Sequence, residues 1–174
     1  MNMKPELCKI EDLSCLYDFY NEVIDHQDKD PYSPGWTKDV YPSLADLESH
    51  LIKDLVYAIR YEDKIIGAGI VSLKEDPIYL DAPWRHKFKE NEIAVLHLFA
   101  IHPTYRGRGL ALKLLDFIME ETEKTSKAIH LDAVKGNLAA AKLYEKAGFT
   151  NAGDHEVWYE DTGFIVVELF EYVY

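Results

Sequence analysis

The segment Arg106-Gly107-Arg108-Gly109-Leu110-Ala111 combines residue types that bind anions. It follows an apolar run and opens a stretch whose apolar residues recur at helical spacing. The first turn of a helix has N–H groups without partners, glycines admit a phosphate close to the backbone, and arginines add charged hydrogen bonds. The segment therefore predicts a pyrophosphate site. A Gly-x-Gly turn with basic residues is also common in loops without a ligand, so the spacing alone leaves both interpretations open.

Two common phosphate motifs are missing from the sequence. It has no Gly-x4-Gly-Lys-Ser/Thr, which excludes an ATP-binding P-loop, and no Gly-x-Gly-x-x-Gly, which argues against a dinucleotide fold. The formal net charge is −12, whereas nucleic-acid binding needs clustered Lys and Arg, so we expect no nucleic-acid partner and no RNA-binding Arg-Gly tract. The acidic balance suits a cationic acceptor, or it serves solubility alone.

Two longer segments carry a family resemblance. Residues 98–111, LFAIHPTYRGRGLA, closely resemble the CoA-binding motif of the GNAT superfamily of N-acetyltransferases, whose signature is met by Arg106, Gly109 and Ala111. Residues 137–149, NLAAAKLYEKAGF, are similar to the second landmark of that family. The resemblance spans nearly the whole chain and implies an enzyme that moves an acetyl group from acetyl-CoA to an amine.

The resemblance also implies which residues bind the cofactor. In similar enzymes the pantetheine arm lies along the strand before the glycine turn, and the pyrophosphate takes the N–H groups of that turn. The implied cofactor-binding residues are Leu98, Phe99, Ala100, Ile101, Arg106, Gly107, Arg108, Gly109, Leu110, Ala111, Asn137 and Tyr144. Asn137 also reads as a helix N-cap, and the two roles are compatible.

Tyr144 matches the position that family members use as a general acid. A phenol with an ordinary pKa of about 10 is well matched to protonate a leaving thiolate. The alternative is a core tyrosine, because Ala140, Leu143 and Ala147 lie on the same face of the expected helix.

The general base is left open by the sequence. His97 interrupts an apolar strand, and its ordinary pKa of about 6.5 suits proton transfer directly or through water. Glu92, at the mouth of the same strand, is the rival, and a structural role for His97 is the plain alternative. Neither Cys8 nor Cys15 maps near the reacting centre, so we expect direct attack in a ternary complex. A backbone N–H of residues 99–101 would hold the oxyanion.

The resemblance also implies that the acceptor enters between the early helices with their loop and the late hairpin. The substrate-binding candidates are Trp36, Tyr41, Trp84 and Trp158, joined by the further aromatic residues Tyr32, Tyr79, His86 and Tyr159 and by the carboxylates Asp28, Asp30 and Asp39. Aromatic faces beside carboxylates suit a small cationic amine, although large side chains also pack under loops for stability alone. A protein N-terminal or lysine acetyltransferase and a non-catalytic acyl-CoA-binding regulator remain alternatives.

The hydrophobic pattern predicts the elements that position these residues. Strands are expected over residues 6–10, 55–61, 65–73, 93–101, 128–134, 156–160 and 164–173, and helices over 13–24, 43–54, 109–124 and 137–147. The polar stretch 74–91 is long for a connection, and such loops are often functional. We expect a single GNAT domain over residues 1–174, with a mixed α/β fold: a mixed, mostly antiparallel sheet of about seven strands and about four helices.

Composition narrows the setting. The 174 residues are 48% hydrophobic, enough for one core, and no apolar run is long enough to span a membrane. The N-terminal residues lack a signal-peptide pattern, and two cysteines form neither a disulfide framework nor a metal site, so we expect a cytoplasmic protein without a metal. The oligomeric state is open, and a homodimer is common among similar proteins.

Overall fold

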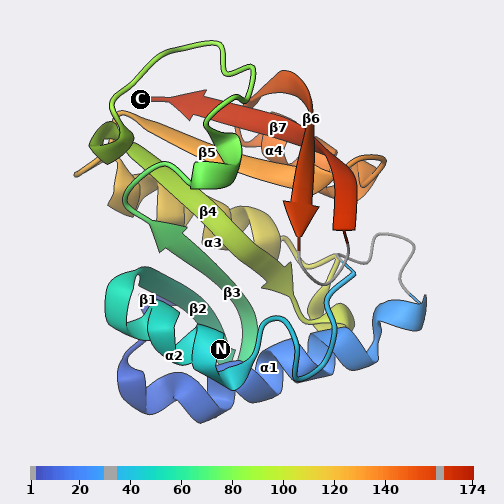
Figure 1. The fold of residues 1–174 in the computed structure, drawn as a ribbon. Helices are drawn as coiled ribbons and strands as arrows, with labels where there is room; N and C mark the ends of the chain where they lie inside the picture. The colour runs from blue at the N-terminus through green and yellow to red at the C-terminus, as the bar shows by residue number, and fades with distance from the viewer. Residues whose placement is uncertain (1–2, 30–34, 160–162) are drawn as a thin grey trace.

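A single sheet runs through the molecule, and helices cover both of its faces (Figure 1). The computed structural model describes residues 3–29, 35–159 and 163–174. Within these residues the sheet has the strand order β1-β2-β3-β4-β5-β7-β6. The strands are β1 (Pro5–Leu7), β2 (Leu55–Tyr61), β3 (Lys64–Ser72), β4 (Ile93–Ile101), β5 (Ala128–Val134), β6 (Thr150–Tyr159) and β7 (Gly163–Val173). The helices are α1 (Leu13–Asp25), α2 (Leu44–Lys53), α3 (Leu110–Thr122) and α4 (Leu138–Lys146).

Amphipathic helices divide the core into layers on the two sides of the sheet. On one side α1 buries Leu16, Phe19, Tyr20 and Val23 in a cluster with residues of β2 and β3. On the other side α3 packs Leu114, Leu115 and Ile118 against the sheet, and α4 adds Tyr144 to the same cluster. A third cluster lies between residues 78–88 and strands β4, β6 and β7.

The parallel pair β4 and β5 is short for two strands of seven or more residues. β4 pairs with β5 only through residues 93–95 and 128–130, and beyond these three pairs the two strands diverge. The connection between them is α3, so the predicted strand–helix–strand unit with parallel strands is confirmed. The divergence leaves one edge of β4 without a strand partner beside residues 96–101.

A bulge bends β4 where the divergence begins. The register with β3 shifts between Ala68 and Ile70, and Leu98 has φ +49°, a conformation that β-strand residues rarely adopt. The buried Tyr20 hydroxyl donates to the Leu98 carbonyl at 2.6 Å and so fixes the bulge from α1. Gly69 faces the bulge, and a Cβ there would lie only 2.9 Å from the Phe99 ring. The Phe99 side chain therefore depends on a glycine opposite it.

The predicted fold class is confirmed, and most boundaries agree within two residues. Ser43 caps α2 as expected, since its hydroxyl accepts from the Asp46 N–H at 3.2 Å. The main error is β6, which begins at Thr150 and not at residue 156. Its first half, TNAGDH, contains few strand formers and is strand-like because it pairs with β7. Two residues of the predicted last turn, 161 and 162, lie outside the described residues.

In the described parts of the chain, no helix has the length and apolar character needed to cross a bilayer.

Replacing Tyr20 by Phe removes the hydrogen bond that fixes the bulge and leaves a buried carbonyl unpaired. We expect the free energy of unfolding to fall by about 1–3 kcal/mol, measured by urea denaturation. The matched control is Tyr17→Phe on the same helix, whose hydroxyl donates to the exposed Asp39. It should cost less than about 0.5 kcal/mol. Equal losses for the two variants would show that Tyr20 does not hold the bulge.

Candidate active site

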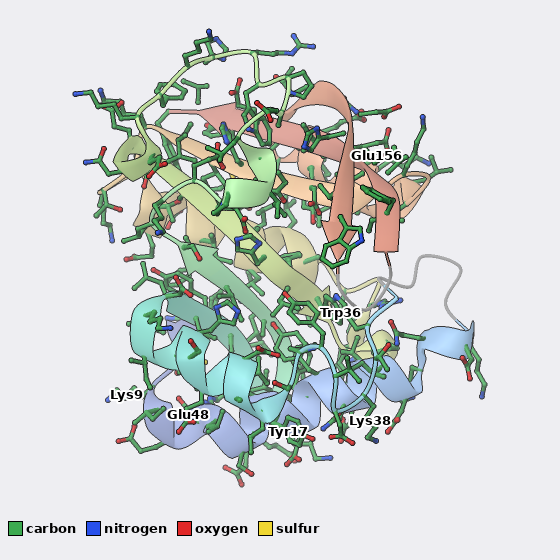
Figure 2. All side chains as sticks on the ribbon, viewed as in Figure 1. Lys9, Tyr17, Trp36, Lys38, Glu48 and Glu156 are labelled. Carbon is green, nitrogen blue, oxygen red and sulfur yellow. The ribbon has the colours of Figure 1, made fainter. Side chains whose placement is uncertain are left out.

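A cleft of about 180 Å³ opens where β4 and β5 diverge. Its wall comes from both strands, from α4, from β7 and from the loop between α1 and α2. The lining residues are Leu96, His97, Leu98, Phe99, Asp132, Ala133, Val134, Asn137, Ala140, Tyr144, Ile165, Val167, Gly35, Trp36 and Tyr41. Figure 2 labels Trp36 on its loop, below the tips of β6 and β7. The cleft thus combines predicted residues from both family landmarks with two of the predicted aromatic residues.

Residues 106–111, here called the Arg-Gly bend, lie between the end of β4 and the first turn of α3. Gly107 and Gly109 both have φ +75°, which favours glycine, and open space surrounds the position of a Cβ at each. Arg106 donates from Nε to the Ile101 carbonyl at 3.2 Å, which ties the bend to the last residue of β4. Arg108 lies over the Tyr105 ring, 5.2 Å from its centroid. With the N-terminus of α3, these groups form an open, positively charged surface that fits a diphosphate.

Tyr144 is buried between aromatic rings of the core. Its ring centroid lies 5.3 Å from that of Phe170 and 6.0 Å from that of Phe149. Burial raises the pKa of its hydroxyl, and the nearby Asp132 carboxylate raises it further. The phenol therefore keeps its proton until a stronger base forms beside it. Tyr144 is thus a core residue that also lines the cleft, and its role as a general acid stays a prediction.

Asp132 is the residue that the sequence analysis did not identify. It lies on β5, lines the cleft, and accepts a hydrogen bond from the Tyr79 hydroxyl at 2.5 Å. Burial raises the pKa of its carboxyl, and the Tyr79 hydrogen bond opposes that effect. A lone carboxylate inside the apolar strand AIHLDAV was the available signal. A carboxylate with a raised pKa in a cleft is suited to accept a proton.

His97 faces the same cleft from β4. Its Nε2 lies 3.6 Å from Oδ2 of Asp76, and its side chain is largely buried. Burial lowers the pKa of the imidazole, and the Asp76 carboxylate opposes that effect. The lowered pKa keeps the ring neutral at pH 7, the state in which it can accept a proton.

Glu92 lies outside the cleft, at the opposite end of β4. Its carboxylate pairs with Lys127 at 2.6 Å, and this hydrogen bond lowers its pKa. Glu92 is not among the described residues that line the cleft, so we do not propose it as the general base. Ala100 and Ile101 also lie outside the cleft wall, on the part of β4 that leads to the bend.

The predicted acceptor residues separate into two groups. Trp36 and Tyr41 line the cleft. Trp84 instead stacks on His130, with ring centroids 3.6 Å apart, and Trp158 is 56% exposed on β6. Asp30 and Tyr32 lie outside the described residues, as does the side chain of Tyr159.

Two of the predicted carboxylates lie outside the cleft wall, whereas Asn137 is part of it. Asp28 is exposed on a short 3-10 turn, and Asp39 accepts from Tyr17. Asn137 caps α4 as predicted, since its Oδ1 accepts from the Ala140 N–H at 3.0 Å, and it also lines the cleft.

The family model for the acetyltransferase (GNAT) family matches residues 20–149. This chain belongs to the GNAT family of acetyltransferases. The recognition made from the two sequence landmarks is therefore confirmed, and acetyl-CoA is the donor typical of that family.

Solved GNAT structures share the whole fold. A GNAT acetyltransferase from Streptococcus agalactiae 2603 has a TM-score of 0.79 and 18% identity, covering 98% of this chain and 95% of that one. A putative acetyltransferase from Salmonella typhimurium, yncA, solved with its cofactor acetyl-CoA, has a TM-score of 0.70 and 17% identity, covering 99% and 94%. At such identities the likeness establishes the fold.

The curated relatives match over shorter stretches. The [ribosomal protein bS18]-alanine N-acetyltransferase of Escherichia coli K12 is 36% identical over 70 residues, which are 40% of this chain and 47% of that protein. The chain spans between a quarter and about half of the length of the curated relatives it matches.

Replacing both Arg106 and Arg108 by Ala should weaken CoA binding by about 2–4 kcal/mol, because each charged hydrogen bond contributes about 1–2 kcal/mol. Isothermal titration calorimetry with CoA measures the dissociation constant. As a control, Lys124→Ala with Lys127→Ala removes the same charge beyond the other end of α3. An unchanged dissociation constant for the arginine variant would contradict the role of the bend.

Proposed function

We propose that this chain is an acetyl-CoA-dependent N-acetyltransferase that acetylates a primary amine of a small cationic acceptor by direct attack in a ternary complex. The observation that supports it most is the presence of Tyr144 and Asp132 together in the cleft between the diverged strands. The proposal assigns the donor to the α3 and α4 side and the acceptor to the side of Trp36 and Tyr41.

Backbone groups hold the donor in this proposal. The N–H groups of residues 107–111 and the two arginine side chains bind the diphosphate, and the edge of β4 over residues 98–101 that faces away from β3 binds the pantetheine amides. A backbone N–H of the same segment stabilises the oxyanion that forms on the acetyl carbonyl. Acetyl-CoA supplies the activated acetyl group as a thioester.

Side chains move the protons. As the amine nitrogen bonds to the acetyl carbon, Asp132 accepts the proton that the nitrogen loses. As the carbon–sulfur bond breaks, Tyr144 donates its proton to the departing thiolate. His97 is the second group placed to accept the amine proton. Burial raises the pKa of the Cys8 thiol to about 12, which makes it a poor nucleophile and supports direct attack.

The acceptor side favours a compact cation. The whole cleft measures about 180 Å³, and Trp36 and Tyr41 line it together with Asp132. A cation gains from both the ring faces and the negative charge. The chain's net charge of −12 also attracts cations to its surface.

A peptide N-terminus is the second candidate acceptor. The observation in its favour is the match over 70 residues to an enzyme whose name specifies the alanine of ribosomal protein bS18. An N-terminal amine presents the same reacting group, so the cleft chemistry described above applies unchanged. The two candidates differ in the surface needed beyond the amine.

Thiol release from acetyl-CoA separates these functions. The acceptors are short diamines, a peptide with N-terminal alanine, and an N-acetylated peptide with one lysine. We expect the highest kcat/KM with a diamine, because the negative charge of the chain attracts its second ammonium group. Tyr144→Phe should lower kcat by about 10²–10⁴-fold without changing the affinity for CoA.

The controls define what each result means. Tyr174→Phe removes a hydroxyl beyond the end of β7 that donates to the Met119 carbonyl at 2.7 Å, and it should leave turnover unchanged. Preference for the alanine peptide would replace the first candidate by the second. CoA binding without thiol release from any acceptor would refute the enzymatic proposal and indicate a binding module.

A further inference from the structure

The segment 73–92, here called the strap, connects β3 to β4 by a long detour. It passes over strands β5, β6 and β7 on the side opposite α3 and α4 (Figure 1). It contains two short 3-10 turns, Pro77–Tyr79 and Glu90–Glu92. The mechanism above uses none of its residues, although the strap contacts the buried polar residues His130 and Glu171.

The outer part of the strap is held by a chain of polar groups, of which Glu75, His130 and Glu171 are buried. Glu75 contacts Nδ1 of His130 at 2.6 Å, and Nε2 of His130 lies 3.3 Å from Glu171. Glu171 in turn contacts Nδ1 of His86 at 2.6 Å. Trp84 stacks on the His130 ring. Three strap residues therefore fasten to β5 and, through Glu171, to β7.

The inner part of the strap reaches the cleft. Tyr79 is 2% exposed and donates its hydroxyl to Oδ2 of Asp132. Asp76 lies beside His97. Asp132 and His130 are two positions apart on β5 and so point to the same face. The strap thus contacts both groups that can take the amine proton, and its anchor lies on the strand that carries one of them.

We propose that Tyr79 is a positioning residue that fixes the Asp132 carboxylate for proton transfer, with the strap anchored at His130 to hold Tyr79 in place. With Oδ2 occupied by the Tyr79 hydroxyl, the other carboxylate oxygen is the one available to the amine. The Tyr79 ring also packs edge-to-face against Trp84, with ring centroids 5.6 Å apart. This inference rests on the proposed function for its catalytic meaning.

A positioning role predicts a pH effect that packing alone does not. The titratable groups that face Asp132 are Tyr79 and Asp76 on the strap, His155 on β6 and Tyr144 on α4. The Tyr79 hydrogen bond lowers the pKa of Asp132 against the effect of burial. Its loss therefore raises that pKa. Because only the ionised carboxylate accepts a proton, activity should then fail at a higher pH than in the wild type.

The variant Tyr79→Phe keeps the ring and removes only the hydroxyl. In the pH profile of kcat/KM, we expect the acidic limb to move upward by about 0.5–1 pH unit, since one hydrogen bond shifts a pKa by about that much. We also expect kcat to fall by roughly tenfold while KM changes little. Tyr174→Phe should leave the profile in place. An acidic limb at the same pH in Tyr79→Phe and the wild type would show that Tyr79 only packs and does not position Asp132.

A titration that does not depend on turnover keeps the two proposals separate. The ¹³C resonance of the Asp132 carboxyl, assigned by its loss in Asp132→Asn, reports the pKa directly. We expect a higher midpoint in Tyr79→Phe than in the wild type. A higher midpoint without acetylation of any amine would sustain the positioning contact and refute the proposed function. Equal midpoints would overturn the inference even in an active enzyme.

Discussion

The early divergence of β4 from β5 is the constraint on which the site depends. Parallel strands normally satisfy each other's backbone groups along their length, yet here only residues 93–95 and 128–130 pair. The bulge at Leu98, held by the Tyr20 hydroxyl, lies just beyond the last of these pairs, Val95 with His130. A longer parallel ladder would close the cleft and leave no free edge for an extended ligand.

The same divergence separates two electrostatic environments. Beyond the end of β4, glycines with positive φ expose backbone N–H groups beside Arg106 and Arg108, which suits an anion. Within the cleft, Asp132 contributes a carboxylate and the aromatic side chains of Trp36 and Tyr41 contribute ring faces, which suits a cation. In the proposed function, the bend binds the anionic donor and the cleft binds the cationic acceptor.

Local patterns predicted much of this arrangement because their causes are local. The apolar run that forms β4, the glycine bend and the Asn137 cap all depend on residues within a few positions of one another. Tyr144 was found through a motif of neighbouring residues. The unpredicted features depend on distant partners. Tyr79 and Asp132 are 53 positions apart, and the first half of β6 is a strand only because β7 lies beside it.

The positions of the aromatic residues also depend on contacts between distant parts of the chain. The family resemblance suggested three tryptophans for the acceptor region, but only the fold determines which of them line the cleft. Trp36 lines the cleft, whereas Trp84, which belongs to the strap, stacks on His130. Glu92 was a candidate base because it directly precedes β4. Its carboxylate instead pairs with Lys127, 35 positions away, at the end of β4 opposite the cleft.

Hydrogen exchange of the backbone amides, measured with and without saturating acetyl-CoA, tests the central claim most directly. The diverged strand and the bend should act as one binding surface, so amides in residues 98–101 and 106–111 should become protected together, while those in β2 should exchange as before. Unchanged exchange in both segments would contradict the account, because the donor would then be bound elsewhere or not at all.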